Sequence, residues 1–362
     1  MKKIGILTFQ RAINYGAALQ MYALQKIVRN LGGIAEIIDY DCRMVSYVYK
    51  PFPFRALYHP KILIRTLYNY NIQKSRNLKF AQFEKKYMNF SEKLVKNELT
   101  RISDSYDTYI VGSDQVWNPF ITGGDTAYFL DFVKNNHKKF SYAASFGVSS
   151  WPQEYKIPAG KLLELFHLIS TREKTGADIV RNLTVQTPTL TVNVDPVFLL
   201  DYDEWRIFVK NSPQQKPYIF IYVVGSGNQS DIYYYAEKLA KEKNLNIINL
   251  RYNKSLRHRE FNLGHMVYDA SPDEFVSYIG NAACVVTDSF HATAFSVIFH
   301  KDMYVSKPRR VSSRITDLFD LAGIQGRFIG ESLKKIHWDK VDKNLEKAKA
   351  DSLAYLRSIV EA

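Results

Sequence analysis

Residues 283–301 read ACVVTDSFHATAFSVIFHK and predict a buried strand that runs directly into a helix. The first four residues are apolar and rich in β-branched side chains, as in strands buried in a sheet. Residues 287–289 (TDS) are of the types that cap helix N-termini, and the apolar residues 292–299 predict a helix buried on nearly all sides. His291 stands in the turn between them. Open α/β sheets bind anions at such turns, so His291 is a candidate acid or base beside a bound phosphate or carboxylate; simple packing at a helix end is the alternative.

The composition indicates an ordinary globular protein of two domains. A chain of 362 residues exceeds the usual size of one hydrophobic core, and its contents of 46% hydrophobic and 23% charged residues are typical. Cys42 and Cys284 both lie in or beside apolar runs, which argues against a disulfide framework or a structural zinc site and fits a reducing cytoplasm. No run approaches the 18 apolar residues of a membrane-spanning helix. We therefore expect a cytoplasmic protein.

The net charge of +13 is concentrated in one segment. Residues 43–110 carry 13 Lys or Arg against 5 Asp or Glu, and the same segment is rich in tyrosine and phenylalanine. Basic and aromatic residues together are typical of surfaces that bind nucleic acid, an anionic membrane or phosphorylated ligands. A solvated face over an ordinary core is the alternative.

Strands and helices alternate along both halves of the chain. The first half opens with a βαβ unit, residues 3–40, whose helix ends at Gly32-Gly33. The alternation restarts at the strand 217–224. We expect an α/β fold of two doubly wound Rossmann-like domains facing a cleft. The predicted parts are residues 1–198 with a basic aromatic insertion at about 43–100, residues 199–340 with the site around His291, and a helix in 341–362 that packs back on the first domain.

Loops after the predicted strands hold most of the polar residues of interest. They should converge, because ligands of such sheets bind beyond the carboxyl ends of the strands. The G-x-G-x-x-G dinucleotide fingerprint is missing. The D-x-D patterns at 39–41 and 201–203 have no further acids near them, so no metal site is predicted, and no G-x-S-x-G elbow exists. Four cations follow the predicted helix 292–299; they are Lys307, Arg309, Arg310 and Arg314. The paired donors of a guanidinium group suit a carboxylate or a phosphate.

Several motifs, taken in order, resemble the polysaccharide pyruvyl transferase family over about residues 3–325. They are GILTF-x-RAINYGAALQ-x-YALQ, VGSDQVWNP, SFG, REKTG, VDPVFLL and TDSFHATAFSVIF. The resemblance implies a fold like that of GT-B-type glycosyltransferases. It also implies transfer of a pyruvyl group from phosphoenolpyruvate to a sugar as a cyclic ketal, with release of phosphate and with His291 as the catalytic residue. Some members place an arginine near that histidine where this chain has Ser289-Phe290, so other cations must hold the donor.

The predicted site follows from these motifs and loops. The donor-binding residues are expected to be Ser289, Thr293, Arg172, Tyr222, Lys307 and Arg314. The acceptor-binding residues are expected to be Arg11, Asn14, Tyr15, Gly16, Ser113, Asp114, Gln115 and Trp117. An imidazole suits the chemistry, because adding a sugar hydroxyl to C2 of the donor requires a proton at C3 and removal of the hydroxyl proton. Phosphoenolpyruvate is then a co-substrate, and neither a cofactor nor a metal is expected.

Three functions remain open on the sequence. The first is a pyruvyl transferase acting on a capsule or exopolysaccharide precursor. Its acceptor would be a sugar or a lipid-linked oligosaccharide, and the basic aromatic segment would contact the anionic inner membrane face. The second is a GT-B-type glycosyltransferase that uses a nucleotide sugar. The third is a basic protein that binds nucleic acid or a membrane surface without catalysis; we expect no nucleic-acid partner, because His291 would have no role there.

Overall fold

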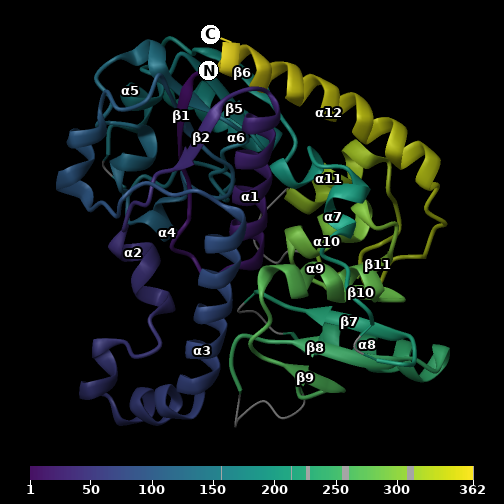
Figure 1. Ribbon diagram of the computed structural model, residues 1–362. Helices are drawn as coiled ribbons and strands as arrows, with labels where there is room; N and C mark the ends of the chain where they lie inside the picture. Colours follow the sequence, from purple (N-terminus) through teal and green to yellow (C-terminus); the bar gives the residue numbers. More distant parts are fainter. Residues whose placement is uncertain (156, 213, 226–228, 255–260, 308–313, 362) are drawn as a thin grey trace.

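Two parallel β-sheets, each flanked by helices, form the protein (Figure 1). The computed structural model describes residues 1–361 except 156, 213, 226–228, 255–260 and 308–313. The first sheet has the strand order β2-β1-β3-β4-β5-β6 and the second the order β11-β10-β7-β8-β9. The strands are β1 (Lys3–Leu7), β2 (Ile34–Ile37), β3 (Thr108–Val111), β4 (Lys139–Ser141), β5 (Leu168–Thr171), β6 (Thr189–Val192), β7 (Tyr218–Tyr222), β8 (Asn246–Leu250), β9 (His265–Val267), β10 (Cys284–Thr287) and β11 (Asp302–Val305).

Twelve α-helices and six 3₁₀ helices are found in the described residues. The α-helices are α1 (Tyr15–Asn30), α2 (Arg43–Ser46), α3 (Pro60–Tyr87), α4 (Pro119–Thr122), α5 (Ala159–Leu163), α6 (Lys174–Leu183), α7 (Tyr202–Arg206), α8 (Ser230–Lys243), α9 (Pro272–Asn281), α10 (Phe290–Ile298), α11 (Arg314–Ala322) and α12 (Trp338–Glu361). The 3₁₀ helices are η1 (Tyr47–Tyr49), η2 (Phe54–Tyr58), η3 (Lys96–Ile102), η4 (Thr126–Phe129), η5 (Asn136–Lys138) and η6 (Pro196–Phe198). Among the described residues, no helix is both long enough and apolar enough to cross a bilayer.

The strand orders confirm the predicted α/β fold with two Rossmann-like sheets. In each sheet the chain starts at an inner strand and winds outward in both directions, which is the doubly wound arrangement. The points where the winding reverses lie between β1 and β3 in the first sheet and between β7 and β10 in the second. Loops that leave the carboxyl ends of these four strands are the expected place for a ligand.

The helix predicted at 292–299 is α10, and it begins two residues earlier than predicted, at Phe290. Ser289 is its N-cap, and the Ser289 hydroxyl accepts a hydrogen bond from the Ala292 backbone N–H at 3.4 Å. His291 therefore lies in the first turn of α10 instead of the preceding loop. The short strand β9 was not predicted, since its three residues follow a glycine and begin with an exposed histidine.

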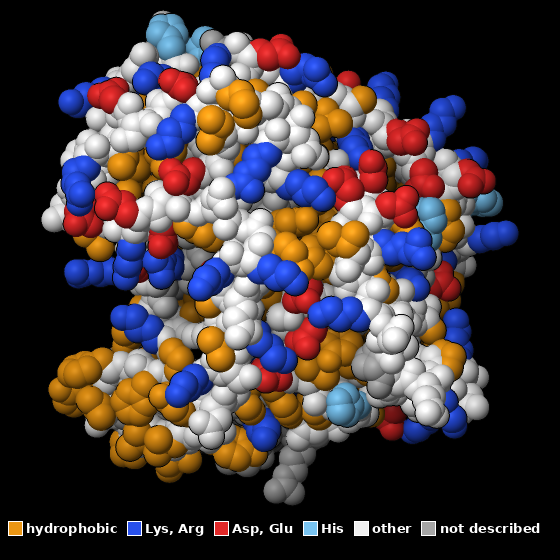
Figure 2. Space-filling view, in the orientation of Figure 1, with side chains coloured by type: hydrophobic (Ala, Val, Ile, Leu, Met, Phe, Trp, Pro, Cys, Tyr) orange, Lys and Arg blue, Asp and Glu red, His pale blue; other side chains and the backbone are white. Residues whose placement is uncertain are grey.

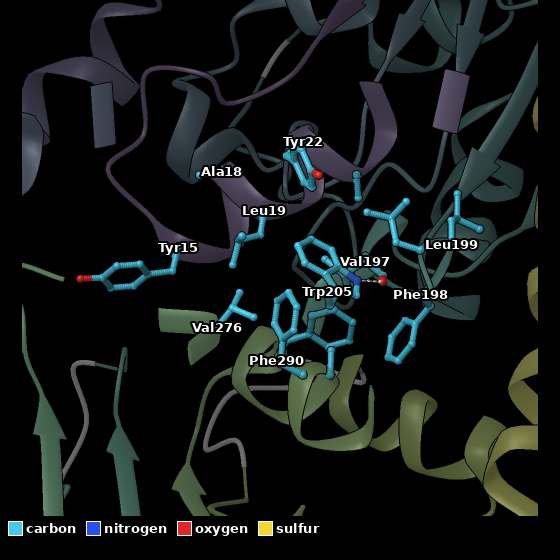
Figure 3. Packing of buried hydrophobic residues seen from close by; sticks show 14 of the residues in the cluster. Tyr15, Ala18, Leu19, Tyr22, Val197, Phe198, Leu199, Trp205, Val276 and Phe290 are labelled. Atoms are coloured by element: carbon cyan, nitrogen blue, oxygen red, sulfur yellow. Dashed lines mark hydrogen bonds between the residues drawn. The ribbon is translucent and has the colours of Figure 1, made fainter. Parts of the chain in front are cut away.

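An apolar interface joins the two sheets and their helices. We call the sheet β1–β6 with its helices the first lobe and the sheet β7–β11 with its helices the second lobe. Side chains of α1 pack against α9 and α10 of the second lobe, and they belong to one continuous hydrophobic cluster (Figure 3). Tyr15 is the most telling member: its ring stacks on Phe275 at 4.8 Å, and its hydroxyl donates to the Ala270 carbonyl at 3.1 Å. Trp205 closes the same region by donating its indole N–H to the Val197 carbonyl at 2.9 Å.

Two long helices cross between the lobes. The C-terminal helix α12 runs over the top of the molecule (Figure 1), and its Tyr355 hydroxyl donates to the carbonyl of Ser141 in β4 at 2.8 Å. The helix α3 descends on the other side beside β8 and β9. Its Arg76 guanidinium donates to the Tyr252 carbonyl at 2.6 Å. These contacts hold the second lobe from both sides.

Candidate active site

His291 lies at the junction of the two lobes. Only 7% of the residue is exposed. One side of the ring faces the first turn of α1 so closely that a Cβ on Gly16 would lie 2.5 Å from the ring Cε1 and closer still to Nδ1. On the other side, Nε2 lies 3.4 Å from a carboxylate oxygen of Asp195. A residue of the second lobe is thus enclosed by two elements of the first.

Asp195 is the centre of a buried ionic cluster. Its Oδ2 accepts a hydrogen bond from Arg172 Nη1 at 2.7 Å and one from the Ser113 hydroxyl at 3.2 Å. Its Oδ1 accepts from the Val197 backbone N–H at 3.1 Å, which caps η6. Burial by itself would raise the pKa of Asp195, but the charge of His291 and the charge and hydrogen bond of Arg172 outweigh it and hold that pKa well below its usual range. The carboxylate is therefore ionised and orients the imidazole.

Arg172 uses only part of its donor capacity. Besides Asp195, its guanidinium has Glu173 Oε2 at 3.6 Å and Asp114 Oδ1 at 3.9 Å, and it stacks 4.9 Å from the centre of the Phe290 ring. Burial opposes its charge, but these carboxylates raise the pKa of Arg172 above its ordinary value. Its Nε and Nη2 are the atoms nearest to Glu173 and Asp114; both are buried, and neither forms a hydrogen bond among the described residues. That edge of a guanidinium is the one that can bind two oxygens of a carboxylate or phosphate.

A cavity of about 270 Å³ opens beside this cluster, between β5 and β6 of the first lobe and α10, α11 and α12. Arg172, Asp195, Phe290 and Arg314 are among its lining residues. Arg172 and Arg314 line the same cavity. Burial lowers the pKa of Arg314, and the positive charge of Arg172 lowers it further. His291 adjoins the cavity through Asp195 and Phe290.

The cavity is not strongly cationic. Its described lining carries three cations and four carboxylates, namely Arg172, Lys174, Arg314, Glu173, Asp195, Asp317 and Asp351. Binding of a small anion would therefore depend on particular donors and not on net charge. Arg309 and Arg310, which the sequence also offers, lie outside the described residues.

The remaining predicted donor residues have partners within the protein. Thr293 donates its hydroxyl to the Ser289 carbonyl at 2.9 Å, one turn back in α10. Tyr222 is buried and shares a hydrogen bond of 2.9 Å with the Tyr252 hydroxyl. Lys307 pairs with Glu331 at 2.9 Å. Ser289 caps the helix as described above. Of the predicted donor set, the structure brings Arg172 and Arg314 to the cavity.

The predicted acceptor residues separate into three groups. Ser113 and Asp114 join the Asp195 cluster, and Gly16 lies against His291. Asn14 caps α1, since its side chain accepts from the Ala17 backbone N–H at 3.1 Å. The other four contact residues of the protein itself. Gln115 accepts a hydrogen bond from the Asn118 side chain at 2.9 Å, and Arg11 forms a bidentate pair with Asp39. Tyr15 lies in the core between the lobes, and Trp117 is buried and donates to the Tyr128 carbonyl.

Asp195 and Glu173 are the site residues that the sequence reasoning missed. Both stand inside motifs that drew attention, REKTG and VDPVFLL, but the motifs do not indicate that Asp195 lies beside His291 of the other lobe. A signal was present: Glu173 and Asp195 come two and three residues after the ends of β5 and β6, and ligands of such sheets bind beyond strand ends. In the described part of the chain, no group of three or more His, Cys, Asp or Glu residues could hold a metal ion.

Solved structures with the same fold are sugar-nucleotide enzymes of the GT-B type. The UDP-GlcNAc 2-epimerase from Methanocaldococcus jannaschii is 12% identical with a TM-score of 0.53, over 96% of this chain and 92% of that one. A putative UDP-N-acetylglucosamine 2-epimerase from Listeria monocytogenes is 9% identical with a TM-score of 0.54, over 100% and 91%. MnaA from S. aureus, solved with UDP, is 13% identical with a TM-score of 0.51, over 99% and 91%. At these identities the likeness shows the shared fold.

The sequence itself identifies the family. No curated protein matches it closely enough to count as a relative. The polysaccharide pyruvyl transferase family, in contrast, matches residues 14–305, a range that includes Arg172, Asp195 and His291. This protein belongs to the polysaccharide pyruvyl transferase family.

Proposed function

We propose that this protein transfers a pyruvyl group from phosphoenolpyruvate to a sugar of a capsule or exopolysaccharide precursor, forming a ketal and releasing phosphate. The observation that carries the proposal is the buried cluster in which Asp195 joins His291 of one lobe to Arg172 of the other, beside a cavity of about 270 Å³. An imidazole, a carboxylate beside it and an arginine at the cavity are the groups that this chemistry requires.

The reaction that we propose uses His291 as the acid and base. One sugar hydroxyl attacks C2 of the donor while C3 gains a proton, which turns the methylene carbon into a methyl group and consumes the double bond. A second hydroxyl of the same sugar then attacks C2, the bond to the phosphate oxygen breaks, and phosphate leaves. Each hydroxyl gives up one proton; one of the two is matched by the proton gained at C3, and the other leaves with the phosphate. General acid–base catalysis by one such group contributes on the order of 10²–10⁴-fold in rate.

Arg172 and Arg314 are the donor-binding residues in this proposal. The Nε and Nη2 edge of Arg172 matches two oxygens of a carboxylate or phosphate, and Arg314 faces the same cavity. A low-dielectric site strengthens such contacts, because little water competes for the charges. Phosphoenolpyruvate is a co-substrate here, and the proposed steps need no cofactor or metal.

Access to the imidazole requires movement between the lobes. His291 is enclosed by Gly16 on one side and Asp195 on the other, and both belong to the first lobe. Parting of the two lobes would expose the ring to the donor in the cavity and to an acceptor near Ser113 and Asp114. Domain closure over substrates also excludes water from such reactions.

The decisive experiment combines binding and turnover. Purified protein is incubated with phosphoenolpyruvate and candidate sugars, free and lipid-linked, and phosphate release is followed; His291→Ala serves as the comparison. Calorimetry with phosphoenolpyruvate and with UDP-GlcNAc identifies the donor. Binding of the nucleotide sugar without binding of phosphoenolpyruvate would overturn the proposal and favour a glycosyltransferase. Phosphate release that His291→Ala retains would remove the imidazole from the mechanism.

A further inference from the structure

The far end of the insertion carries an apolar surface that the rest of the protein leaves uncovered. We call residues 50–68, which include η2 and the start of α3, the distal tip. Five of its large hydrophobic side chains are more than half exposed: Phe54, Leu57, Tyr58, Ile64 and Leu67. Figure 2 shows hydrophobic side chains gathered at the lower left of the molecule, where Figure 1 places η2 and the beginning of α3. Scattered single residues of this kind are common on surfaces, but a contiguous group marks an interaction site.

The same segment has a one-sided charge. Residues 43–83 contain eight Lys or Arg and no Asp or Glu. Lys50, Lys61, Arg65 and Lys74 are exposed at or next to the distal tip. Farther along α3 the cations serve the fold instead: Lys79, for example, pairs with Glu274 of the second lobe at 3.1 Å. At the tip, Lys50 lies 5.8 Å from the centre of the Tyr47 ring, and no ion pair with an acidic residue is found for Lys50, Lys61, Arg65 or Lys74 among the described residues.

Hydrogen bonds anchor α3 to the second lobe just beyond the distal tip. Asn69 accepts a hydrogen bond from the Lys254 backbone N–H at 2.7 Å, and Gln73 donates to the Asn253 side chain at 2.9 Å. Arg76 donates to the carbonyls of Tyr252 and Tyr268. These bonds hold the middle of α3 against the second lobe, and Ile64 and Leu67 lie on the same helix directly before them.

We propose that the distal tip binds an anionic lipid surface. Aromatic side chains favour the interface between headgroups and acyl chains, and aliphatic ones insert slightly deeper. Lysine and arginine at the edge contact the lipid phosphates. Charge disfavours a second copy of this chain as the occupant, since two such tips would bring cations against cations with no acidic residue between 43 and 83 to pair with them.

The contact would not involve the catalytic groups. The interlobe core begins where Phe80 of α3 contacts Tyr15, the neighbour of Gly16, with ring centres 5.1 Å apart. Pro60 to Phe80 is 20 residues of helix, or about 30 Å at 1.5 Å per residue. The distal tip can therefore be changed without touching His291, and lipid binding is measured without donor or acceptor. Its outcome is thus separate from that of the proposed reaction.

The test measures co-sedimentation of the full chain with phosphatidylcholine vesicles, with and without one-third phosphatidylglycerol, over a range of salt. Each Lys or Arg near an anionic surface contributes about fivefold to the binding constant. The variant K50Q/K61Q/R65Q/K74Q should therefore bind anionic vesicles at least ~100-fold more weakly. The matched control K238Q/K241Q/K343Q/K347Q removes the same charge from exposed positions of α8 and α12 and should bind like the unchanged protein. The variant F54S/L57S should lose the binding that resists high salt.

Four outcomes would overturn the proposal. They are no binding to anionic vesicles, equal binding to neutral ones, equal weakening by the control variant, and full binding by the quadruple variant. A concentration-dependent dimer that F54S/L57S abolishes, without any vesicle binding, would instead assign the distal tip to a second copy. Thermal unfolding of each variant and phosphate release with a water-soluble acceptor should match the unchanged protein, because the substituted side chains are exposed.

Discussion

Gly16→Ala is the sharpest test of the interlobe site. It adds one carbon, which would lie 2.5 Å from Cε1 of His291 and nearer still to Nδ1, whereas ordinary contacts begin at about 3.4 Å. The ring or the helix α1 must therefore shift by about 1 Å or more. The ring has little room to retreat, because Asp195 lies on its other side and α10 is buried. We expect the two lobes to be displaced at this point.

The stability cost should be small and the catalytic cost large. Overpacking costs about 1–3 kcal/mol, while replacing a helical glycine by alanine returns about 0.5–1 kcal/mol. The net loss in free energy of unfolding should thus be about 0–2.5 kcal/mol, which a protein of this size survives. A misplacement of about 1 Å in catalytic geometry can cost on the order of 10²-fold in turnover. We therefore expect kcat for phosphate release to fall about 100-fold while the protein stays folded.

Gly280→Ala provides the matched control. Its new Cβ would lie 2.6 Å from a methyl carbon of Val209, a similar steric conflict inside α9 and away from His291. It should lower the melting temperature without lowering kcat. Phosphate release at saturating donor and acceptor, with thermal unfolding of both variants, checks the expectation. If folded Gly16→Ala kept kcat within about threefold of the unchanged protein, the proposed position of the imidazole in the reaction would be refuted.

Four further predictions concern the ionic cluster. His291→Ala should keep the fold and lose nearly all turnover; more than about a tenth of the activity remaining would contradict an acid–base role. Asp195→Asn leaves the buried Arg172 cation without its carboxylate and should lower the free energy of unfolding in urea by about 3–5 kcal/mol. A decrease of less than about 1 kcal/mol would show that this ion pair contributes little to stability. The pKa of Asp195 is depressed in the folded state, so its contribution to stability is present above about pH 4 and is lost as the pH falls below that value. The free energy of unfolding should therefore fall less steeply with decreasing pH in Asp195→Asn than in the unchanged protein. Parallel curves for the two proteins would contradict this. Arg172→Lys and Arg314→Ala should mainly raise KM for phosphoenolpyruvate, the first by losing the paired donors, and an unchanged KM would remove that arginine from the donor site.

The alternation of strand and helix patterns was sufficient to predict the architecture. Buried parallel strands read as short apolar runs, as in residues 218–222 and 284–287, and each is followed by turn residues and an amphipathic or buried helix. The strand β9 was not predicted because its three residues, of which only Val267 is buried, form no such apolar run. The start of α10 differed by two residues because the cap is set by the backbone geometry at Ser289.

Aromatic residues near strand ends were the least predictable part of the site. Tyr15, Trp117 and Tyr222 follow or end predicted strands, where a ring can stack on a sugar or fill a core. All three are buried in the protein, and each hydroxyl or indole N–H has an internal partner. Sequence spacing places such a residue at the edge of a sheet but does not indicate whether the other lobe covers it.

The sequence by itself determined two Rossmann-like lobes, the family, the loops that carry the polar residues, and the position of His291 at a helix start. Only the tertiary structure decided that Asp195 lies between His291 and Arg172, that Gly16 borders the imidazole, and that the distal tip is exposed. The reason is physical. Local patterns reflect the burial and hydrogen bonding of neighbouring residues, whereas these contacts join residues roughly 20 to 275 positions apart and depend on how the two lobes dock.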